Sequence, residues 1–205
     1  MGGNENQRTI QAYDHAPDQY AQRTPAMVEG FVKEWIDQAL SLLSPGATIL
    51  ELGTGTGRDA SYLESWGFAV DRTEASIGLL ERLRAQEIPA RPLNVVTDEV
   101  GGSYDMVFAN AVFHHFPLSV VGAVLRKVRQ ALKDEGIFAF STKEGQGEQW
   151  ETDKLGRPRF FHYWTAEALT ERLTSTGFSV LQLRSALRGA SGELWINVIA
   201  RRNNG

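Results

Sequence analysis

Apolar residues along this chain alternate between two spacings from position 24 to position 141. Amphipathic stretches with apolar residues three and four apart predict helices over residues 24–43, 58–66, 76–86 and 118–132. Short β-favouring runs between them predict strands over 47–52, 68–73, 90–93, 104–109 and 136–141. Strands that are separated by helices of this length need crossover connections, so the pattern predicts a doubly wound, mostly parallel α/β sheet with helices on both faces.

The last third of the chain departs from this alternation. A helix is predicted over 165–175, and two further strands over 178–185 and 194–201. Only the short glycine-containing turn at residues 189–192 separates the main body of these two strands, so they must pair antiparallel. The stretch 143–164 is longer than an ordinary connection, and we interpret it as a lid-like insertion. Residues 1–7 are polar, and we expect them to be disordered.

Length and composition limit the possible classes of protein. With 205 residues the chain is predicted to form one domain, which consists of an N-terminal arm and helix (1–44) and a core (45–200) that carries the insertion. The absence of cysteine excludes disulfide frameworks, thiolate zinc sites and cysteine nucleophiles, and it fits a reducing compartment. We therefore expect a cytoplasmic protein.

Charge and hydropathy narrow the range of partners. The formal net charge is -4, and acidic and basic residues are interspersed, without the basic stripe that nucleic-acid binding requires. No run approaches the 18 or so apolar residues of a membrane span. We expect a small-molecule ligand, neither a nucleic acid nor a membrane, and the oligomeric state is left open.

The most informative segment lies between the strand at 47–52 and the helix at 58–66. Gly53, Gly55 and Gly57 allow the backbone to turn tightly and to approach a ligand closely, and the helix offers its free amide groups there. The dinucleotide fingerprint has a different glycine spacing, Gly-x-Gly-x-x-Gly. Glu51, two residues before the first glycine, is a poor neighbour for a pyrophosphate and a good one for a cation. Asp59, near the helix N-terminus, is interpreted as a capping-type charge.

This segment resembles the first motif of the class I S-adenosylmethionine (SAM) dependent methyltransferases, an acid followed by Gly-x-Gly-x-Gly. The resemblance covers about residues 45 to 200 and implies SAM as cofactor and a Rossmann-like methyltransferase fold, with seven strands and an antiparallel C-terminal hairpin. It also implies that Glu74 holds the ribose hydroxyls, with Asp71 as the rival, and that Asn94 or Asp98 contacts the adenine. The expected cofactor-binding residues are Glu51, Gly53, Thr54, Gly55, Gly57, Glu74, Asn94, Asn110, Tyr13 and Tyr20. The two tyrosines resemble an aromatic N-terminal segment that folds over the cofactor, with simple packing of a terminal arm as the alternative.

Candidate catalytic residues follow the strands at 104–109 and 136–141. His114 and His115 could take a proton from an attacking oxygen or nitrogen, or they could merely pack or cap the next helix. Lys143 emerges at the same edge of the sheet. Adjacent histidines point apart and no acid–histidine spacing accompanies them, so no metal site is predicted. In the insertion, the expected substrate-binding residues are Trp150, Arg157, Arg159 and Tyr163, whose arginines could clamp a carboxylate or phosphate.

A sulfonium donor is already activated, so the reaction would be a direct in-line displacement in which the protein aligns the partners. We therefore predict methyl transfer from SAM to an oxygen or nitrogen of a small molecule, which the lid arginines suggest is anionic. Two alternatives stay open. One is an NAD(P)-dependent oxidoreductase on a related sheet, and the other is a protein that binds SAM without catalysis.

Overall fold

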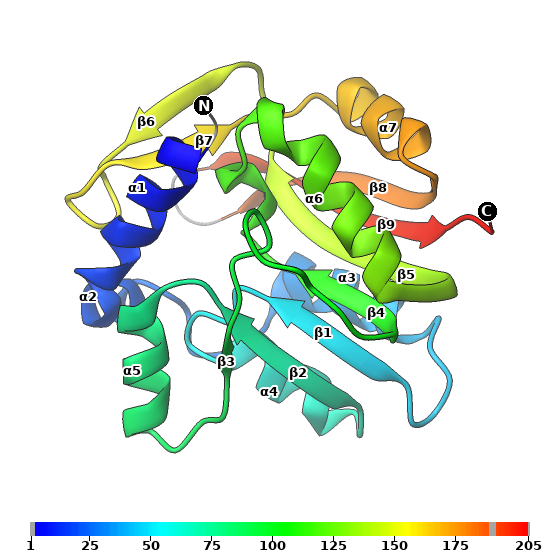
Figure 1. The fold of residues 1–205 in the computed structure, drawn as a ribbon, viewed down its shortest axis with the longest axis horizontal. Helices are drawn as coiled ribbons and strands as arrows, with labels where there is room; N and C mark the ends of the chain where they lie inside the picture. The colour runs from blue at the N-terminus through cyan, green and yellow to red at the C-terminus, as the bar shows by residue number, and fades with distance from the viewer. Residues whose placement is uncertain (1–2, 189–191, 205) are drawn as a thin grey trace.

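A computed structural model describes residues 3–188 and 192–204 of the chain, and its centre is a seven-stranded sheet (Figure 1). The strand order is β3-β2-β1-β4-β5-β9-β8. Neighbouring strands are parallel except β9, which pairs antiparallel with both β5 and β8. This confirms the predicted fold class. The strands are β1 (Thr48–Leu52), β2 (Ala69–Glu74), β3 (Arg91–Pro92), β4 (Tyr104–Ala109), β5 (Leu132–Lys143), β8 (Phe178–Arg188) and β9 (Glu193–Arg202).

Helices cover both faces of the sheet. In Figure 1, α6 (Leu118–Ala131) and α7 (Ala166–Ser175) lie in front of it, and α3 (Gly30–Leu40) and α4 (Arg58–Ser65) lie behind. The front helices are held by an apolar stripe, which on α6 includes Val121, Leu125 and Val128, all fully buried. Behind the sheet, Trp35 of α3 stacks on Phe108 of β4 with 5.3 Å between ring centroids. Helix α5 (Ile77–Ala85) contacts the outer strands β2 and β3.

The central strands position the site. Four of the five residues of β1 are buried, as a strand covered by helices on both faces requires. Strand β1 lies between β2 and β4, so the chain moves outward in one direction through β2 and in the other through β4. In open α/β sheets, ligands bind at the carboxyl ends of the strands at such a reversal of strand order.

The N-terminus differs from the expectation of disorder. Residues 3–7 form the first part of helix α1 (Gly3–Asp14), which is followed by α2 (Pro17–Gln22); Met1 and Gly2 lie outside the described residues. Helix α1 is ordered by contacts with distant segments. The Thr9 hydroxyl accepts a hydrogen bond from the Phe160 amide at 2.9 Å, and the Asn6 side chain accepts one from Asn94 at 2.8 Å. A polar segment without its own apolar stripe gives no sign of such partners in the sequence.

Two predicted boundaries are also wrong. The helix predicted from residue 24 begins at Gly30, because Gly30 has φ +55° and interrupts the right-handed backbone that a longer helix needs. Strand β5 begins at Leu132, four residues before the predicted start. Leu132 pairs with Tyr104, and Glu135, with φ +60°, accompanies a break in the register of β4 and β5. Helix α6 therefore ends at Ala131.

The insertion at 143–164 contains a hairpin that the sequence pattern does not predict. Strands β6 (Glu148–Glu151) and β7 (Arg159–His162) pair antiparallel, and all four residues of β7 are buried. Helix α1 packs against β7, beside the short helix η1 (Phe113–His115). The turn expected at residues 189–192 falls largely on 189–191, which lie outside the described residues. Within the described part of the chain, none of the helices has both the length and the apolar character that crossing a bilayer requires.

Candidate active site

Two adjoining cavities lie at the carboxyl ends of β1, β2 and β4. The first, which we call the inner cavity, is lined by the glycine turn, the ends of β2 and β4, and helix α1. The second, the outer cavity, extends from the same turn to the β6–β7 hairpin and to the end of β8, and has a volume of about 690 Å³. The two cavities share wall residues, which are Tyr13, Tyr20, Gly53, Asn110 and Ala111. The inner cavity is narrow, about 90 Å³, because α1 lies over it.

The glycine turn lies directly between the two cavities. Gly53 and Gly55 have φ of +70° and +58°, a conformation that side chains disfavour. A Cβ atom at Gly53 would lie 2.6 Å from the Val112 Cγ2 atom, and one at Gly55 would lie 3.0 Å from the Tyr20 hydroxyl. The turn thus needs glycine for both its backbone and its close neighbours. Thr54 is buried within it and lines the outer cavity.

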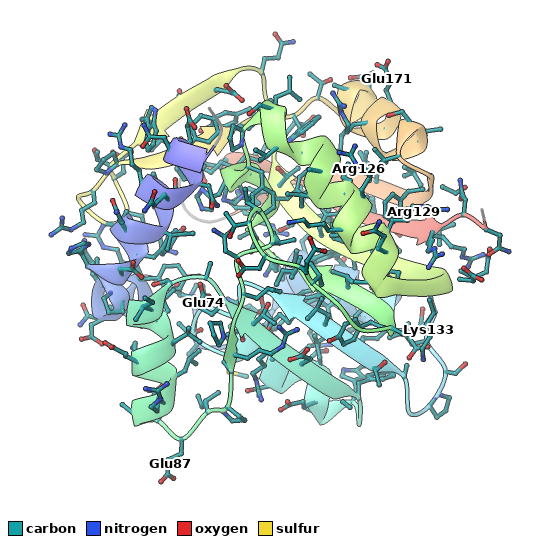
Figure 2. The ribbon with its side chains drawn as sticks, in the orientation of Figure 1. Glu74, Glu87, Arg126, Arg129, Lys133 and Glu171 are labelled. Atoms are coloured by element: carbon teal, nitrogen blue, oxygen red, sulfur yellow. The ribbon has the colours of Figure 1, made fainter. Side chains whose placement is uncertain are left out.

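Glu74 ends β2 and lines the inner cavity, below α1 in Figure 2. Its carboxylate accepts hydrogen bonds from the amides of Gly55, Ala75 and Ser76, each at 2.9 Å. Burial nevertheless raises the pKa of Glu74 above its usual value, in spite of these bonds. The rival Asp71 instead pairs with Arg91 at 2.8 Å and lines neither cavity, so the structure brings Glu74 and not Asp71 to the site.

Glu51 is buried beneath the glycine turn and lines neither cavity directly. Its Oε2 atom has no hydrogen-bond partner among the described residues. Burial, together with the nearby carboxylate of Asp59, raises the pKa of Glu51 to about 8. At neutral pH Glu51 is therefore largely protonated in the ligand-free protein, and a cation bound at the glycine turn would favour its ionised form.

Of the two residues expected to contact adenine, only Asn94 reaches the inner cavity. Asn94 lines the inner cavity, while its side-chain oxygen accepts a hydrogen bond from the Val96 amide at 3.1 Å. Asp98 lines neither cavity; it accepts hydrogen bonds from the Asn94 amide and the Thr97 hydroxyl, at 2.8 Å each. The geometry therefore brings Asn94 to the cavity and uses Asp98 to fix the turn after β3.

Tyr13, His115 and Arg159 form a buried network at the shared wall. The Nδ1 atom of His115 lies 2.7 Å from the Phe160 carbonyl oxygen, which can only accept, so Nδ1 carries the proton. The Nε2 atom therefore accepts from the Tyr13 hydroxyl at 2.8 Å, and that oxygen in turn accepts from Arg159 Nη1 at 3.2 Å. Burial and the charge of Arg159 lower the pKa of His115 to about 3. His115 is thus a neutral ring with both nitrogens engaged.

His114 lies on the other side of this network and lines the outer cavity. Its ring stacks on Phe161 with centroids 5.2 Å apart and meets Trp195 edge-on at 5.1 Å. Its Nδ1 atom has no partner among the described residues. Burial, followed by the neighbouring His115 and Lys143, lowers the pKa of His114 well below its usual value, so the ring is neutral at pH 7.

Asn110, after β4, is fixed by a network that the sequence does not reveal. Its amide nitrogen donates to Asp59 at 2.7 Å, and its oxygen accepts from Ser141 at 2.7 Å and from Arg188 at 3.2 Å. The next residue, Ala111, has φ +61°, which is uncommon outside glycine. Asp59 and Arg188 therefore belong to the site. Asp59, interpreted from the sequence as a capping-type charge, also accepts from Asn110 and lines the outer cavity, whereas nothing local marks Arg188.

The wall of the outer cavity carries both acidic and basic residues, and several of the basic ones are not paired with an acid. Lys143 is neutralised by Glu193 at 2.8 Å and Glu151 at 3.1 Å. Four other cations on its wall have no carboxylate within 4 Å among the described residues: Arg23, which donates to backbone carbonyls, and Lys154, Arg159 and Arg188. Burial lowers the pKa of Lys154 to about 8 and that of Arg188 to about 10, as expected for desolvated cations.

The remaining residues predicted to bind substrate do not line either cavity. Trp150 packs against Phe160 and lies under Arg8, whose guanidinium carbon is 4.2 Å from the ring centroid. Arg157 is exposed in the turn between β6 and β7. The Tyr163 hydroxyl bonds to Glu151 and to Gln149. Across residues 3–188 and 192–204, no group of three or more histidine, aspartate or glutamate side chains is arranged to hold a metal ion.

Comparison with known proteins gives one family. Residues 23–183 match the family described as a methyltransferase domain. Over 100 residues the chain is 31% identical to a malonyl-[acyl-carrier protein] O-methyltransferase of Acetivibrio thermocellus. This match covers 46% of the chain and only 35% of the relative's own length, so the chain resembles about a third of that relative.

Solved structures share the fold at low identity. The 1,6-didemethyltoxoflavin-N1-methyltransferase of Burkholderia thailandensis, solved with its substrate and S-adenosylhomocysteine (SAH), has a TM-score of 0.74 at 19% identity, over 97% of this chain and 88% of that one. The [4+2]-cyclase SpnF has a TM-score of 0.71 at 15% identity, over 98% and 97%. The same fold thus occurs in proteins named for different reactions.

Proposed function

The chain belongs to the methyltransferase domain family, and on that premise we propose that it moves a methyl group from SAM to an oxygen or nitrogen of a small anionic molecule. The observation that carries the proposal is the pair of cavities with a common wall. A methyl donor in the inner cavity and an acceptor in the outer cavity would meet at Tyr13, Gly53 and Asn110. Holding two reactants in line in this way accounts for a large part of the rate of a displacement reaction.

The residues of the inner cavity fit SAM. Glu74 ends β2 where ribose hydroxyls would replace its backbone partners, and Asn94 stands at the end of the cavity where the adenine is expected. The unsatisfied Oε2 atom of Glu51 lies beneath the turn at which the cationic part of the cofactor is expected. When bound, SAM supplies an activated methyl group. The protein's own residues orient the partners and exclude water.

The two histidines have different roles in this proposal. His115 is a positioning residue, since both of its nitrogens are engaged and it holds the Tyr13 hydroxyl at the shared wall. His114 lines the outer cavity as a neutral ring whose pKa is lowered by burial; it is a weak base there, and its role is to orient the nucleophile by accepting a hydrogen bond from it. An acceptor that attacks through an anionic oxygen needs no base. Lys143 is held between two carboxylates, and its role is to fix the β6–β7 hairpin and β9 around the cavity.

The charge of the outer cavity favours an anionic acceptor. Arg159 is buried, Lys154 and Arg188 are half-buried, and none of the three has a carboxylate within 4 Å among the described residues, an arrangement that an anion would stabilise. The acyl-carrier-protein relative is named as an O-methyltransferase, and the toxoflavin enzyme as an N1-methyltransferase. Both kinds of acceptor atom therefore belong in the search for a substrate.

Two other functions are less well supported. An NAD(P)-dependent oxidoreductase would call for Gly-x-Gly-x-x-Gly after β1, and it would not explain the antiparallel β9 or the family match. A protein that binds SAM without transferring its methyl group is the stronger of the two alternatives, because a [4+2]-cyclase shares this fold.

The test combines binding with turnover. The protein is titrated with SAH and NAD by calorimetry, and is then incubated with SAM and separate panels of carboxylic acids, phosphorylated compounds, amines and phenols, with methylated products detected by mass spectrometry. We expect binding of SAH but not NAD, and product from an anionic acceptor. The Arg159→Met variant should lose product, and Arg126→Met, on the outer face of α6 (Figure 2), should not. Methylation confined to neutral acceptors would refute the anionic assignment, and SAH binding without any product would favour the non-catalytic alternative.

A further inference from the structure

The outer cavity contains two arginines, the buried Arg159 and the half-buried Arg188, that belong to separate local networks. Arg159 comes from β7 and Arg188 ends β8. The guanidinium carbon of Arg159 lies 4.8 Å from the Phe161 ring centroid, and that of Arg188 lies 4.7 Å from the Trp195 ring centroid. Phe161 and Trp195 are the two aromatic rings that flank His114. The arginines are therefore placed on two different aromatic supports around one histidine.

Neither arginine has a carboxylate within 4 Å in the described part of the chain; Asp59, which shares Asn110 with Arg188, acts on Arg188 from farther away. Arg159 donates to the neutral Tyr13 hydroxyl at 3.2 Å. Arg188 donates to neutral oxygens of Asn110, Ser141 and Asn197. The Nε atoms of both arginines are buried and have no partner among the described residues. The two sets of partners have no residue in common.

Lys143 is a buried cation of the same cavity that has carboxylate partners, and it serves as a comparison for the two arginines. It has two carboxylate partners within 3.1 Å, although it also lies in the outer cavity. A cation removed from water without a directly bonded carboxylate destabilises the folded protein, so the buried Arg159 and the half-buried Arg188, neither of which has such a partner, are a cost that folding alone does not explain. Guanidinium groups bind carboxylate and phosphate oxygens through paired, charge-assisted hydrogen bonds.

We propose that the methyl acceptor carries two anionic groups, one bound by Arg159 and the other by Arg188, so that the body of the acceptor lies beside His114. This inference rests on the proposed function, because it concerns the acceptor of the same reaction. It goes further in requiring two separate anion positions. A single carboxylate would leave one of the two arginines uncompensated. The apolar surfaces of Phe161 and Trp195 would contact the part of the acceptor between its charges.

SAM carries a carboxylate of its own, so the test must separate the cofactor from the acceptor. The wild-type protein is first saturated with SAH and then titrated by calorimetry with the unbranched α,ω-dicarboxylates of three to eight carbons. Each dicarboxylate is compared with its own monoamide, which has nearly the same size and one charge fewer. Because charge-assisted hydrogen bonds are involved, we expect at least one dicarboxylate to bind about tenfold more tightly than its monoamide.

Two variants then assign the charges to the arginines. Arg159→Met and Arg188→Met should each bring the ratio of dicarboxylate to monoamide affinity close to one, while SAH affinity stays at the wild-type value. Arg159→Lys and Arg188→Lys keep the charge and should retain a preference of about threefold, and they replace the methionine variants if those fail to fold. Arg126→Met, on the outer face of α6, is the matched control and should leave every ratio unchanged.

Three results would overturn the inference. The first is equal binding of every dicarboxylate and its monoamide to the wild-type protein. The second is a preference that survives in Arg188→Met. The third is a loss of SAH affinity in Arg188→Met with an unchanged ratio, which would assign Arg188 to the cofactor. If the proposed function fails and this inference holds, the protein would still prefer dicarboxylates over monoamides but would transfer no methyl group to any acceptor. The two failures can therefore be distinguished.

Discussion

At the scale of single residues, burial disfavours the charged form of several titratable side chains in the site, and a bound ligand can offset this cost. Glu51, Asp59 and Glu74 surround the glycine turn, and the pKa of Glu51 and that of Glu74 are both raised by burial. Two neutral histidines are buried near cations, His115 on the wall of the inner cavity and His114 on that of the outer cavity. Because these groups titrate differently in the folded and unfolded chain, the free energy of unfolding depends on pH and on ligand binding, and both dependences can be measured.

Glu51→Gln should change the pH dependence of folding. The carboxyl has a pKa of about 8 in the folded chain and about 4.5 in the unfolded chain, so the folded state binds its proton more tightly and wild-type stability falls as pH rises from 4.5 through 8. The variant removes this fall. Its free energy of unfolding by urea should exceed the wild-type value at pH 8, while its affinity for SAH decreases. Glu87→Gln, an exposed residue after α5 (Figure 2), should behave as wild type. A wild-type slope in Glu51→Gln would contradict the buried carboxylate.

His115→Gln should change the stability of the protein at acidic pH. The histidine has a pKa of about 3 when folded and 6.5 when unfolded, so the unfolded chain binds the proton more tightly and wild-type stability falls as pH decreases below 6.5. In the variant, the loss of stability between pH 6.5 and 5 should be smaller. Urea unfolding at each pH measures it, and His15→Gln, at an exposed histidine, is the control. If both variants showed the wild-type slope, His115 would not be a buried neutral ring.

Gly53→Ala should abolish cofactor binding for a steric reason. An alanine at position 53 must adopt a left-handed φ, which typically costs about 1–2 kcal/mol. At the shared wall, its Cβ atom would also lie 2.6 Å from Val112 Cγ2. Gly67→Ala is the matched control, because Gly67 has φ +86° and open space around it. Both variants should lose stability in thermal unfolding, but only Gly53→Ala should lose SAH affinity. Equal SAH binding by the two variants would contradict the assigned position of the turn.

At the scale of elements, helix α1 covers the inner cavity without belonging to the main cores of the sheet. It contributes Asn6, Thr9, Ile10 and Tyr13 to the lining of that cavity. Its buried Ala12 belongs to a small separate cluster with Ala16 and Leu155. Because the cavity beneath α1 is narrow, the helix must move for a ligand the size of SAM to enter.

Deletion of residues 1–16 should therefore open the cavity and spare the fold. We expect amide protons of β4 and β5 to stay protected from hydrogen exchange, because the two large clusters that cover the sheet contain no residue of α1. SAH affinity should fall at least tenfold through the loss of Tyr13 and its neighbours, about 1.4 kcal/mol or more. Unchanged SAH affinity, or loss of protection throughout the sheet, would show that α1 is not a cover.

The elements that the sequence predicted well are those whose periodicity reflects burial. Strands β1 and β4 and helix α6 have the expected apolar patterns because they lie in the core. Strand β6 was missed because its residues, Glu148–Glu151, are mostly polar, and α1 was missed because polar side chains hold it in place. Arg188 could not be found in advance, since its role depends on residues distant in the chain, whereas Glu74 was found at the end of a predicted strand.

At the scale of the whole molecule, charge is distributed unevenly. The chain has a net charge of -4, and yet the wall of the outer cavity holds cations, Lys154, Arg159 and Arg188, that form no ion pair among the described residues. The overall negative charge repels anions from most of the surface, whereas the cations of the outer cavity attract them. This combination disfavours non-specific binding of anions elsewhere on the protein. The fold alone does not decide the chemistry, because a methyltransferase and a [4+2]-cyclase share it. The residues of the two cavities must decide it.

The most direct test of the central claim is calorimetric titration of the protein with SAH, in the wild type and in Glu74→Gln. Loss of a charge-assisted hydrogen bond to a ribose hydroxyl is worth about 1.5–3 kcal/mol. We predict saturable binding at one site in the wild type, weakened at least tenfold in the variant. No saturable heat with SAH up to millimolar concentration, or equal binding by both proteins, would contradict a cofactor site at the ends of β1, β2 and β4.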